Sequence, residues 1–143
     1  MDVGREKLSF AVHGWSSISA ESLHVRPQED GSYEIESLPF FFQGATLGDI
    51  VIVWEEVEGQ NEAQVCGGQG NSLIRVFVPE QSDLESLHAA IKRKDLLVER
   101  FDQYGLLAVN VDKTAPYSTI LNWLADEAGE VGGELEEALC RHS

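Results

Sequence analysis

The chain has 143 residues, of which 43% are hydrophobic, and its formal net charge is −15 at pH 7. This length allows a sizeable core without metals or disulfides, and it is too short for two large domains. The charge argues against nucleic acid and anionic membranes as partners, because binding either one requires cations that replace the released counterions.

The N-terminal sequence lacks the basic start and the apolar run of a secretory signal, and no apolar stretch approaches the roughly 20 residues that span a bilayer. We therefore expect a soluble, cytoplasmic protein. Cys66 and Cys140 are the only cysteines, and two isolated thiols form neither a disulfide framework nor a metal site with Cys-x-x-Cys spacing. Two free thiols are expected, with a Cys66–Cys140 disulfide as the alternative.

The first half of the chain has the pattern of short strands separated by turns. Leu8–Val12 alternates apolar residues with polar or small ones and predicts a first strand. Glu21–Arg26 and Ser32–Leu38 alternate more regularly, and Asp30-Gly31 between them supplies the positive φ of a tight turn. The sequence therefore predicts an antiparallel hairpin.

An aromatic run follows this hairpin. Pro39 cannot donate to a strand ladder, so Phe40-Phe41-Phe42 is predicted to be an irregular segment that plugs one end of a sheet. Ile50–Trp54 is β-branched and apolar on both faces, which indicates a central strand, and Glu62–Cys66 returns after a turn at Gly59–Asn61. Five short antiparallel strands with an aromatic plug predict a small bent sheet or half-barrel.

The pattern changes after Gly70, where strands and helices alternate. A helix is predicted over Asp83–Asp95, because Ser82 and Glu85 form a capping box and Leu84, Leu87, His88 and Ile91 form one buried stripe. A second helix is predicted to start at Thr114–Pro116 and to end before Gly132. Glu134–Cys140 fits either a final strand or an extension of that helix. Strands are predicted at Leu73–Val78, Leu96–Phe101 and Leu106–Val111.

The order β-α-β-β-α, followed by the segment that fits a strand or a helix, is typical of the ferredoxin-like, or split βαβ, arrangement. The glycine-rich connection at residues 67–70 is too short for a flexible tether. We therefore predict an α+β protein in which a β-rich lobe, residues 1–70, packs on a ferredoxin-like lobe, residues 71–143, in one compact unit.

The negative charge is concentrated in two stretches. Nine acidic residues and no Lys or Arg lie between Pro27 and Ile74, and six more, again without Lys or Arg, lie between Thr114 and Cys140. Such a field attracts a basic surface and accelerates association with it. Solubility alone is the alternative explanation of the acidity.

The sequence contains no recognisable catalytic or metal-binding pattern. Its four histidines are scattered, without His-x-Glu or His-Glu-x-x-His spacing. Gly67–Ser72 lacks the Gly-Lys-Ser/Thr ending of a phosphate-binding loop and leads into a strand, so it predicts a turn. Cys66 and His24 are the best available nucleophile and base, and nothing in the sequence brings them together. We predict no enzymatic activity, no metal and no cofactor.

Aromatic and acidic residues coincide in two places, after Ile52-Val53 and near the end of the second predicted helix. An exposed tryptophan among carboxylates is typical of a hot spot for a basic protein partner. The alternative is that both tryptophans complete the core. The predicted partner-binding residues are Trp54, Glu55, Glu56, Glu58, Glu62, Trp123, Asp126 and Glu127.

Several ordered segments resemble one family of short bacterial cytoplasmic proteins that is known as a domain of unknown function. They are turns and strand starts, so the resemblance implies an architecture and supplies no catalytic residue. The acidity and the tryptophan-acid pairs depart from the family pattern. The matching segments are Glu21-Ser22-Leu23, Asp30-Gly31-Ser32-Tyr33, Leu38-Pro39-Phe40-Phe41, Gly44, Leu47-Gly48-Asp49, Gly70-Asn71-Ser72, Arg75-Val76 and Gly105-Leu106-Leu107-Ala108-Val109.

These observations favour an acidic protein-binding module. The most concrete hypothesis is an immunity protein that neutralises a basic toxin domain, such as a nuclease, by occlusion and by mimicry of a phosphate-rich substrate. The alternative hypothesis is a small-ligand-binding or regulatory domain, because split βαβ folds often bind metabolites where helices meet strands.

Overall fold

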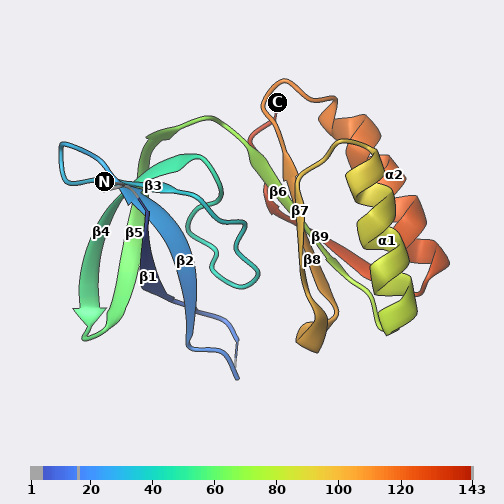
Figure 1. The fold of residues 1–143 in the computed structure, drawn as a ribbon, viewed down its shortest axis with the longest axis horizontal. Coiled ribbons are helices and arrows are strands. Elements are labelled where there is room, and N and C mark those ends of the chain that lie inside the picture. Colours follow the sequence, from blue (N-terminus) through green and yellow to red (C-terminus); the bar gives the residue numbers. More distant parts are fainter. Residues whose placement is uncertain (1–4, 16, 143) are drawn as a thin grey trace. The chain divides into compact units, whose positions relative to one another are not determined.

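The computed structural model describes residues 5–15 and 17–142 of the chain. The chain divides into two compact units, one up to Gly70 and the other from Asn71 on (Figure 1). Each unit has its own hydrophobic core. None of the helices in the described ranges is long and apolar enough to cross a membrane.

The N-terminal unit is a closed β-barrel with the strand order β1-β2-β3-β4-β5. Sequential strands pair antiparallel, and parallel pairing of β1 with β5 closes the barrel where Phe10 lies opposite Asn61. The Asn61 side-chain amide donates a hydrogen bond to the Ser9 carbonyl, 2.9 Å away. The predicted bent sheet or half-barrel is thus a complete barrel. Its strands are β1 (Glu6–Ala11), β2 (Ala20–Pro27), β3 (Tyr33–Ile35), β4 (Asp49–Val57) and β5 (Gln60–Gly68).

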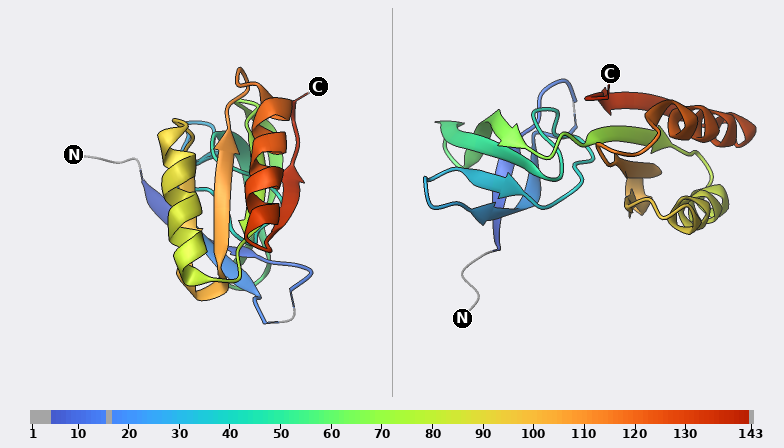
Figure 2. Two further views of the ribbon diagram at one scale, coloured as in Figure 1. Left: turned by 90° about the vertical axis from the view of Figure 1, so that its right-hand side faces the viewer. Right: turned by 90° about the horizontal axis from the view of Figure 1, so that it is seen from above.

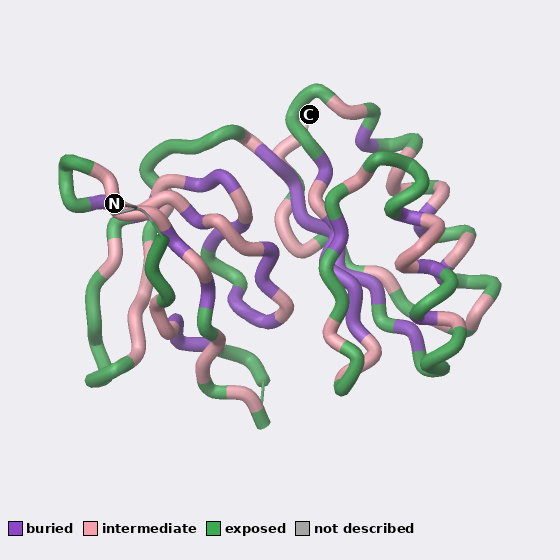
Figure 3. Tube along the Cα trace, in the orientation of Figure 1, coloured by how far each residue is buried: buried purple, intermediate pink, exposed green. Residues whose placement is uncertain are grey.

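Alternating side chains fill the barrel interior, because residues two apart on a strand point to the same face. Leu23 and Val25 on β2 are almost fully buried, and Figure 3 marks such buried segments in purple. The predicted hairpin is confirmed, since Val25 lies opposite Ile35 in the register of β2 and β3. Gly31 in its turn has a φ of 89°, a conformation that side chains disfavour.

The aromatic run lies in the irregular connection between β3 and β4. Phe41 and Phe42 are buried, and the Phe42 ring centroid lies 5.0 Å from that of Phe10. The Glu21 carboxylate on β2 accepts hydrogen bonds from the backbone amides of Phe40, Phe41 and Phe42, at 2.8, 3.0 and 2.8 Å. One side chain therefore supplies the acceptors for three successive amides, and the segment is irregular as predicted.

The C-terminal unit is an antiparallel sheet with the strand order β7-β8-β6-β9. Both helices cover the same face of this sheet (Figure 2). Residues 134–139 form strand β9, which pairs with β6, so the final segment is a strand and not a helical extension. The elements are β6 (Ser72–Phe77), α1 (Gln81–Arg93), β7 (Val98–Phe101), a 3-10 turn (Asp102–Tyr104), β8 (Leu106–Val111), α2 (Tyr117–Glu130) and β9 (Glu134–Leu139).

Helix α1 starts earlier than predicted. The Leu84 amide donates to the Glu80 carbonyl at 2.9 Å, which makes Glu80 the N-cap, and no side chain caps the helix. Ser82 therefore lies inside the helix, and the predicted capping box is wrong. His88 was expected on the buried stripe, but it is partly exposed, and the burial that it does have lowers its pKa.

Removing the Glu21 carboxylate should destabilise the N-terminal unit strongly. Glu21→Ala leaves three backbone amides without their acceptor, at about 1 kcal/mol each, so we expect a loss of about 3 kcal/mol. Glu21→Gln keeps one acceptor oxygen and should lose about half as much. Urea unfolding followed by tryptophan fluorescence measures both, with exposed Ser22→Ala as the control. A Glu21→Ala variant as stable as Ser22→Ala would contradict the assigned role.

Candidate functional site

The outer face of β4 carries exposed apolar side chains. Ile52 and Trp54 share this face, and their exposed fractions are 53% and 41%. Val57, at the end of the strand, is 60% exposed. Val51 and Val53 on the other face belong to the barrel core. Strand β4 is thus central, between β3 and β5, but only one of its two apolar faces is buried, because a closed barrel has a single interior.

Carboxylates flank Trp54 on the same hairpin. Glu62 on β5 lies directly opposite Trp54 in the register, and cross-strand partners share a face. The Glu62 carboxylate pairs with His13, with 3.0 Å between Oε2 and Nε2. Glu56 Oε1 accepts a hydrogen bond from the Trp54 indole N–H at 3.4 Å. The indole is therefore oriented by one carboxylate and bordered by another.

The turn of this hairpin adds two more acids. The Gly59 amide donates to Glu55 Oε2 at 3.0 Å, and Glu58 is exposed in the turn itself. The register between β4 and β5 shifts after Glu55, as at a β-bulge. Trp54 and the four predicted acids therefore lie on one hairpin, together with the exposed apolar residues of β4. We call this group the Trp54 surface, which consists of Ile52, Trp54, Glu55, Glu56, Val57, Glu58 and Glu62.

The second predicted group lies on α2, in the other unit. Trp123 is half-buried and packs against the core of the C-terminal unit. The Lys94 ammonium lies 4.8 Å from the centroid of its ring, which is a cation–π contact. Asp126 is exposed, and Glu127 lines a shallow depression together with Arg93. Trp123 therefore has a lysine over its ring, where the sequence suggested a ring of acids.

A serine-histidine pair was missed by the sequence reasoning. Ser72 Oγ lies 2.7 Å from His142 Nδ1 and accepts a hydrogen bond from the Arg141 amide at 2.8 Å. His142 Nε2 lies 2.7 Å from the Asp112 carbonyl oxygen. Ser72 is fully buried, so its hydroxyl fastens the C-terminal residues to the sheet and is not presented as a nucleophile. Ser72 and His142 meet because β6 and β9 pair antiparallel, which places the start of β6 beside the end of β9.

Tyr117 packs against this pair. Its ring stacks on His142 with 4.9 Å between centroids, and its hydroxyl donates to Glu137 Oε1 at 2.7 Å. Burial raises the pKa of Tyr117 far above its usual range, and the hydrogen bond to Glu137 raises it further. The phenol therefore stays protonated as a donor.

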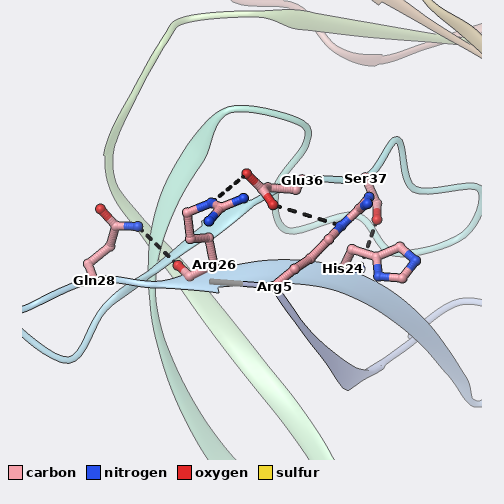
Figure 4. A network of polar contacts seen from close by, with 6 residues as sticks. All are labelled: Arg5, His24, Arg26, Gln28, Glu36 and Ser37. Carbon is pink, nitrogen blue, oxygen red and sulfur yellow. Dashed lines mark hydrogen bonds and ion pairs between the residues drawn. The ribbon is translucent and has the colours of Figure 1, made fainter. Parts of the chain in front are cut away.

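A group of arginines gathers in the N-terminal unit (Figure 4). The Glu36 carboxylate lies 3.0 Å from Arg26 Nε and 3.9 Å from Arg5 Nε, and it thereby links β2 and the residue before β1 to the segment after β3. The cavity beside these residues is also lined by Glu34. Two carboxylates balance two guanidinium groups, so this cavity carries no excess positive charge for an anionic ligand.

Metal-ligating side chains are dispersed. Within residues 5–15 and 17–142, no group of three or more His, Cys, Asp or Glu side chains is placed to hold a metal ion. Cys66 and Cys140 are exposed free thiols in different units. The nearest chemistry to a catalytic pair is Ser72 with His142, and its burial makes it structural.

A sequence profile of the domain of unknown function DUF4265 matches residues 21–134, which is most of the chain. The chain belongs to the DUF4265 family. A comparison with curated proteins found no match for the DUF4265 protein. Its fold is similar to the solved structure of a hypothetical protein from Neisseria gonorrhoeae, with a TM-score of 0.70 and 21% sequence identity over 100% of this chain and 98% of that chain. At this identity the likeness shows the fold alone.

The raised pKa of Tyr117 predicts a pH dependence for the stability of the DUF4265 protein. The unfolded phenol ionises near pH 10 while the folded one stays protonated, so this contribution is complete below about pH 10 and decreases above it. Wild type should lose about 1.4 kcal/mol more per pH unit above pH 10 than Tyr117→Phe. Urea midpoints from pH 8 to pH 11 in reductant measure this difference. Tyr104→Phe is the matched control, and identical slopes for wild type and Tyr117→Phe would contradict the assignment.

Proposed function

We propose that the DUF4265 protein is a protein-binding module and that the Trp54 surface contacts a basic protein partner. In its most concrete form, the protein is an immunity-type inhibitor in the bacterial cytoplasm that neutralises a basic toxin domain, such as a nuclease, by occlusion. The observation that carries this proposal is an exposed tryptophan among carboxylates on a paired β-hairpin.

The composition of the Trp54 surface supports a binding hot spot. Tryptophan is enriched among the residues that dominate interface energies, and Ile52 and Val57 extend the apolar area around it. The backbone of β4 is held by ladders on both sides. A partner would therefore bury Trp54 without first ordering the strand, which lowers the entropic cost of binding.

The charges around the Trp54 surface support a basic partner. Four carboxylates border the apolar residues, and one of them, Glu62, is paired with His13. No Lys or Arg occurs between Pro27 and Ile74 to neutralise the others. Lysines and arginines of a partner would supply the missing cations and would be steered toward this face before contact. In a nuclease, these carboxylates would take the place of substrate phosphates.

The group on α2 receives a smaller part in this proposal. Asp126 and Glu127 contribute negative charge that attracts a basic partner from a distance. Trp123 is packed against the core and covered by Lys94, so its indole is poorly placed for a hot spot. The proposed energetic centre is therefore Trp54.

We interpret the C-terminal unit as ferredoxin-like. The strand order β7-β8-β6-β9 sets β8 between β6 and β7, which is the split βαβ pattern, and the unit ends with β9 paired to β6. This interpretation supports a second candidate function, a small-ligand-binding or regulatory domain. The observation that favours the second function is a cavity between the turn after α1, the end of β8 and the start of α2.

Replacing Trp54 should disable partner binding. The probe is the product of any toxin-like gene found beside the gene for this chain, and isothermal calorimetry measures its affinity. Trp54→Ala should weaken binding about 30-fold, because truncating a hot-spot residue costs about 2 kcal/mol. Trp15→Ala is the matched control, because Trp15 is also 41% exposed but packs edge-on against Phe41.

Salt gives an independent readout of the same complex. Raising the ionic strength should weaken binding by wild type and slow association, because exposed charges are screened beyond about 8 Å at 0.15 M salt. The double variant Glu56→Gln/Glu58→Gln should flatten this salt dependence. Absence of binding to the adjacent gene product, or an affinity indifferent to salt and to Trp54→Ala, would count decisively against the proposal.

A further inference from the structure

A cavity of about 500 Å³ lies in the C-terminal unit. It is bordered by the turn that follows α1, by the last residues of β8 and by the first turns of α2. This volume is in the usual range of small-molecule sites, about 300–1,000 Å³. The cavity shares no residue with the Trp54 surface, so it is independent of the protein-binding proposal.

The walls of the cavity are mainly apolar. Leu96 and Leu97 line it from the turn after α1, and Ile120 and Trp123 line it from α2. Lys94 also lines the cavity, and its contact with the Trp123 ring holds the ammonium group at this position. An apolar body with a charged end would thus find both a hydrophobic wall and a cation.

Asn110 supplies an unsatisfied polar atom. It lines the cavity from β8, and its Oδ1 is buried without a hydrogen-bond partner among the described residues. Leaving such an atom unpaired costs about 1–3 kcal/mol, and native proteins accept this cost in few places. Because this oxygen is shielded from water, a ligand N–H would reach and satisfy it once the Asn110 side chain turns toward the cavity. Asp112, which also lines the cavity, adds a negative charge beside it.

The start of α2 supplies hydrogen-bond donors to the same cavity. Its N-cap is Pro116, and no side chain caps the helix, so its first-turn amides have no helical partner. These amides and the Lys94 ammonium both favour a carboxylate.

Helix α1 ends in a left-handed residue at the edge of the cavity. Among the described residues, Asp95 is the sole non-glycine residue with a positive φ, 61°, and it directly precedes the leucines that line the cavity. A left-handed residue directly after the C-cap is a common way to end a helix. Here it turns the chain from α1 toward Leu96 and Leu97.

We propose that this cavity binds an apolar α-amino acid. Its side chain packs against Trp123, Ile120 and Leu96, its carboxylate faces Lys94 and the start of α2, and its ammonium group faces Asn110 and Asp112. A nucleotide fits poorly, because its phosphates would face Asp95 and Asp112 with a single lysine among the lining residues. This inference rests on the second candidate function and names its ligand class.

Two-dimensional NMR of the full chain tests the proposal. The probes are L-leucine, L-phenylalanine and L-tryptophan, with 3-phenylpropionate and phenethylamine as analogues that lack the ammonium or the carboxylate. We expect the amino acids to shift the Trp123 indole and Asn110 side-chain signals at millimolar concentration or below, and each analogue to bind at least tenfold more weakly. The Trp15 and Trp54 indole signals should not move.

Two variants separate binding from structure. Asn110→Leu removes the unsatisfied amide, so it should bind the amino acids at least tenfold more weakly while its thermal midpoint stays unchanged or rises. Lys94→Ala should also bind at least tenfold more weakly, and Lys92→Ala, which removes a neighbouring exposed lysine outside the cavity, should bind like wild type. A lower midpoint for Asn110→Leu with unchanged affinity would overturn the assignment of Asn110 to the ligand.

The remaining outcomes also decide the proposal. No shift of the Trp123 and Asn110 signals up to 10 mM amino acid would overturn it. Shifts of these signals by an analogue but not by any amino acid would overturn the ligand class and leave a ligand-binding function standing. If all compounds shift these signals to the same extent, only their apolar parts contribute to binding. This result would overturn the proposed contacts of the carboxylate and ammonium groups.

Discussion

The Glu21 carboxylate accepts the backbone hydrogen bonds that a neighbouring strand would otherwise accept. The connection between β3 and β4 is irregular, yet it buries Phe41 and Phe42, the second of them beside Phe10. Buried amides need acceptors, and one carboxylate receives three of them in succession. The aromatic rings can therefore be buried without a sixth strand beside them. The barrel in turn gives β4 a single interior, which leaves Ile52 and Trp54 outside.

The sequence predicted those parts of the fold that depend on local pattern. Period-two alternation and a glycine turn located the β2–β3 hairpin, and helical periodicity located α1 and α2. Closure of the barrel was not predictable, because it depends on one parallel contact between residues far apart in the chain, Phe10 and Asn61. The start of α1 was misplaced for a different reason. Ser82 and Glu85 match the capping pattern, but the Glu80 carbonyl closes the first turn before them.

The candidate sites divide in the same way. The carboxylates near Trp54 were all in one predicted hairpin, and the register of β4 and β5 places Glu62 across from Trp54. The exposure of Trp54 was not predictable, since an apolar strand has the same pattern whether one face or both are covered. Around Trp123, the nearby acids were visible in the sequence, but Lys94 comes from the turn after α1, far from Trp123 in the chain. The cavity with Asn110 was not predictable, because it forms only where the turn after α1, the end of β8 and the start of α2 meet. None of these three segments has a distinctive sequence pattern by itself.

The apolar outer face of β4 has a consequence for the protein by itself. Contiguous exposed apolar side chains are a common site of association between copies of a protein. Here they are bordered by Glu55, Glu56, Glu58 and Glu62, and like charges on two copies repel one another before the two faces can meet. These carboxylates therefore oppose aggregation of the protein. The acidity of the chain keeps copies of this face apart while leaving it open to a surface of opposite charge.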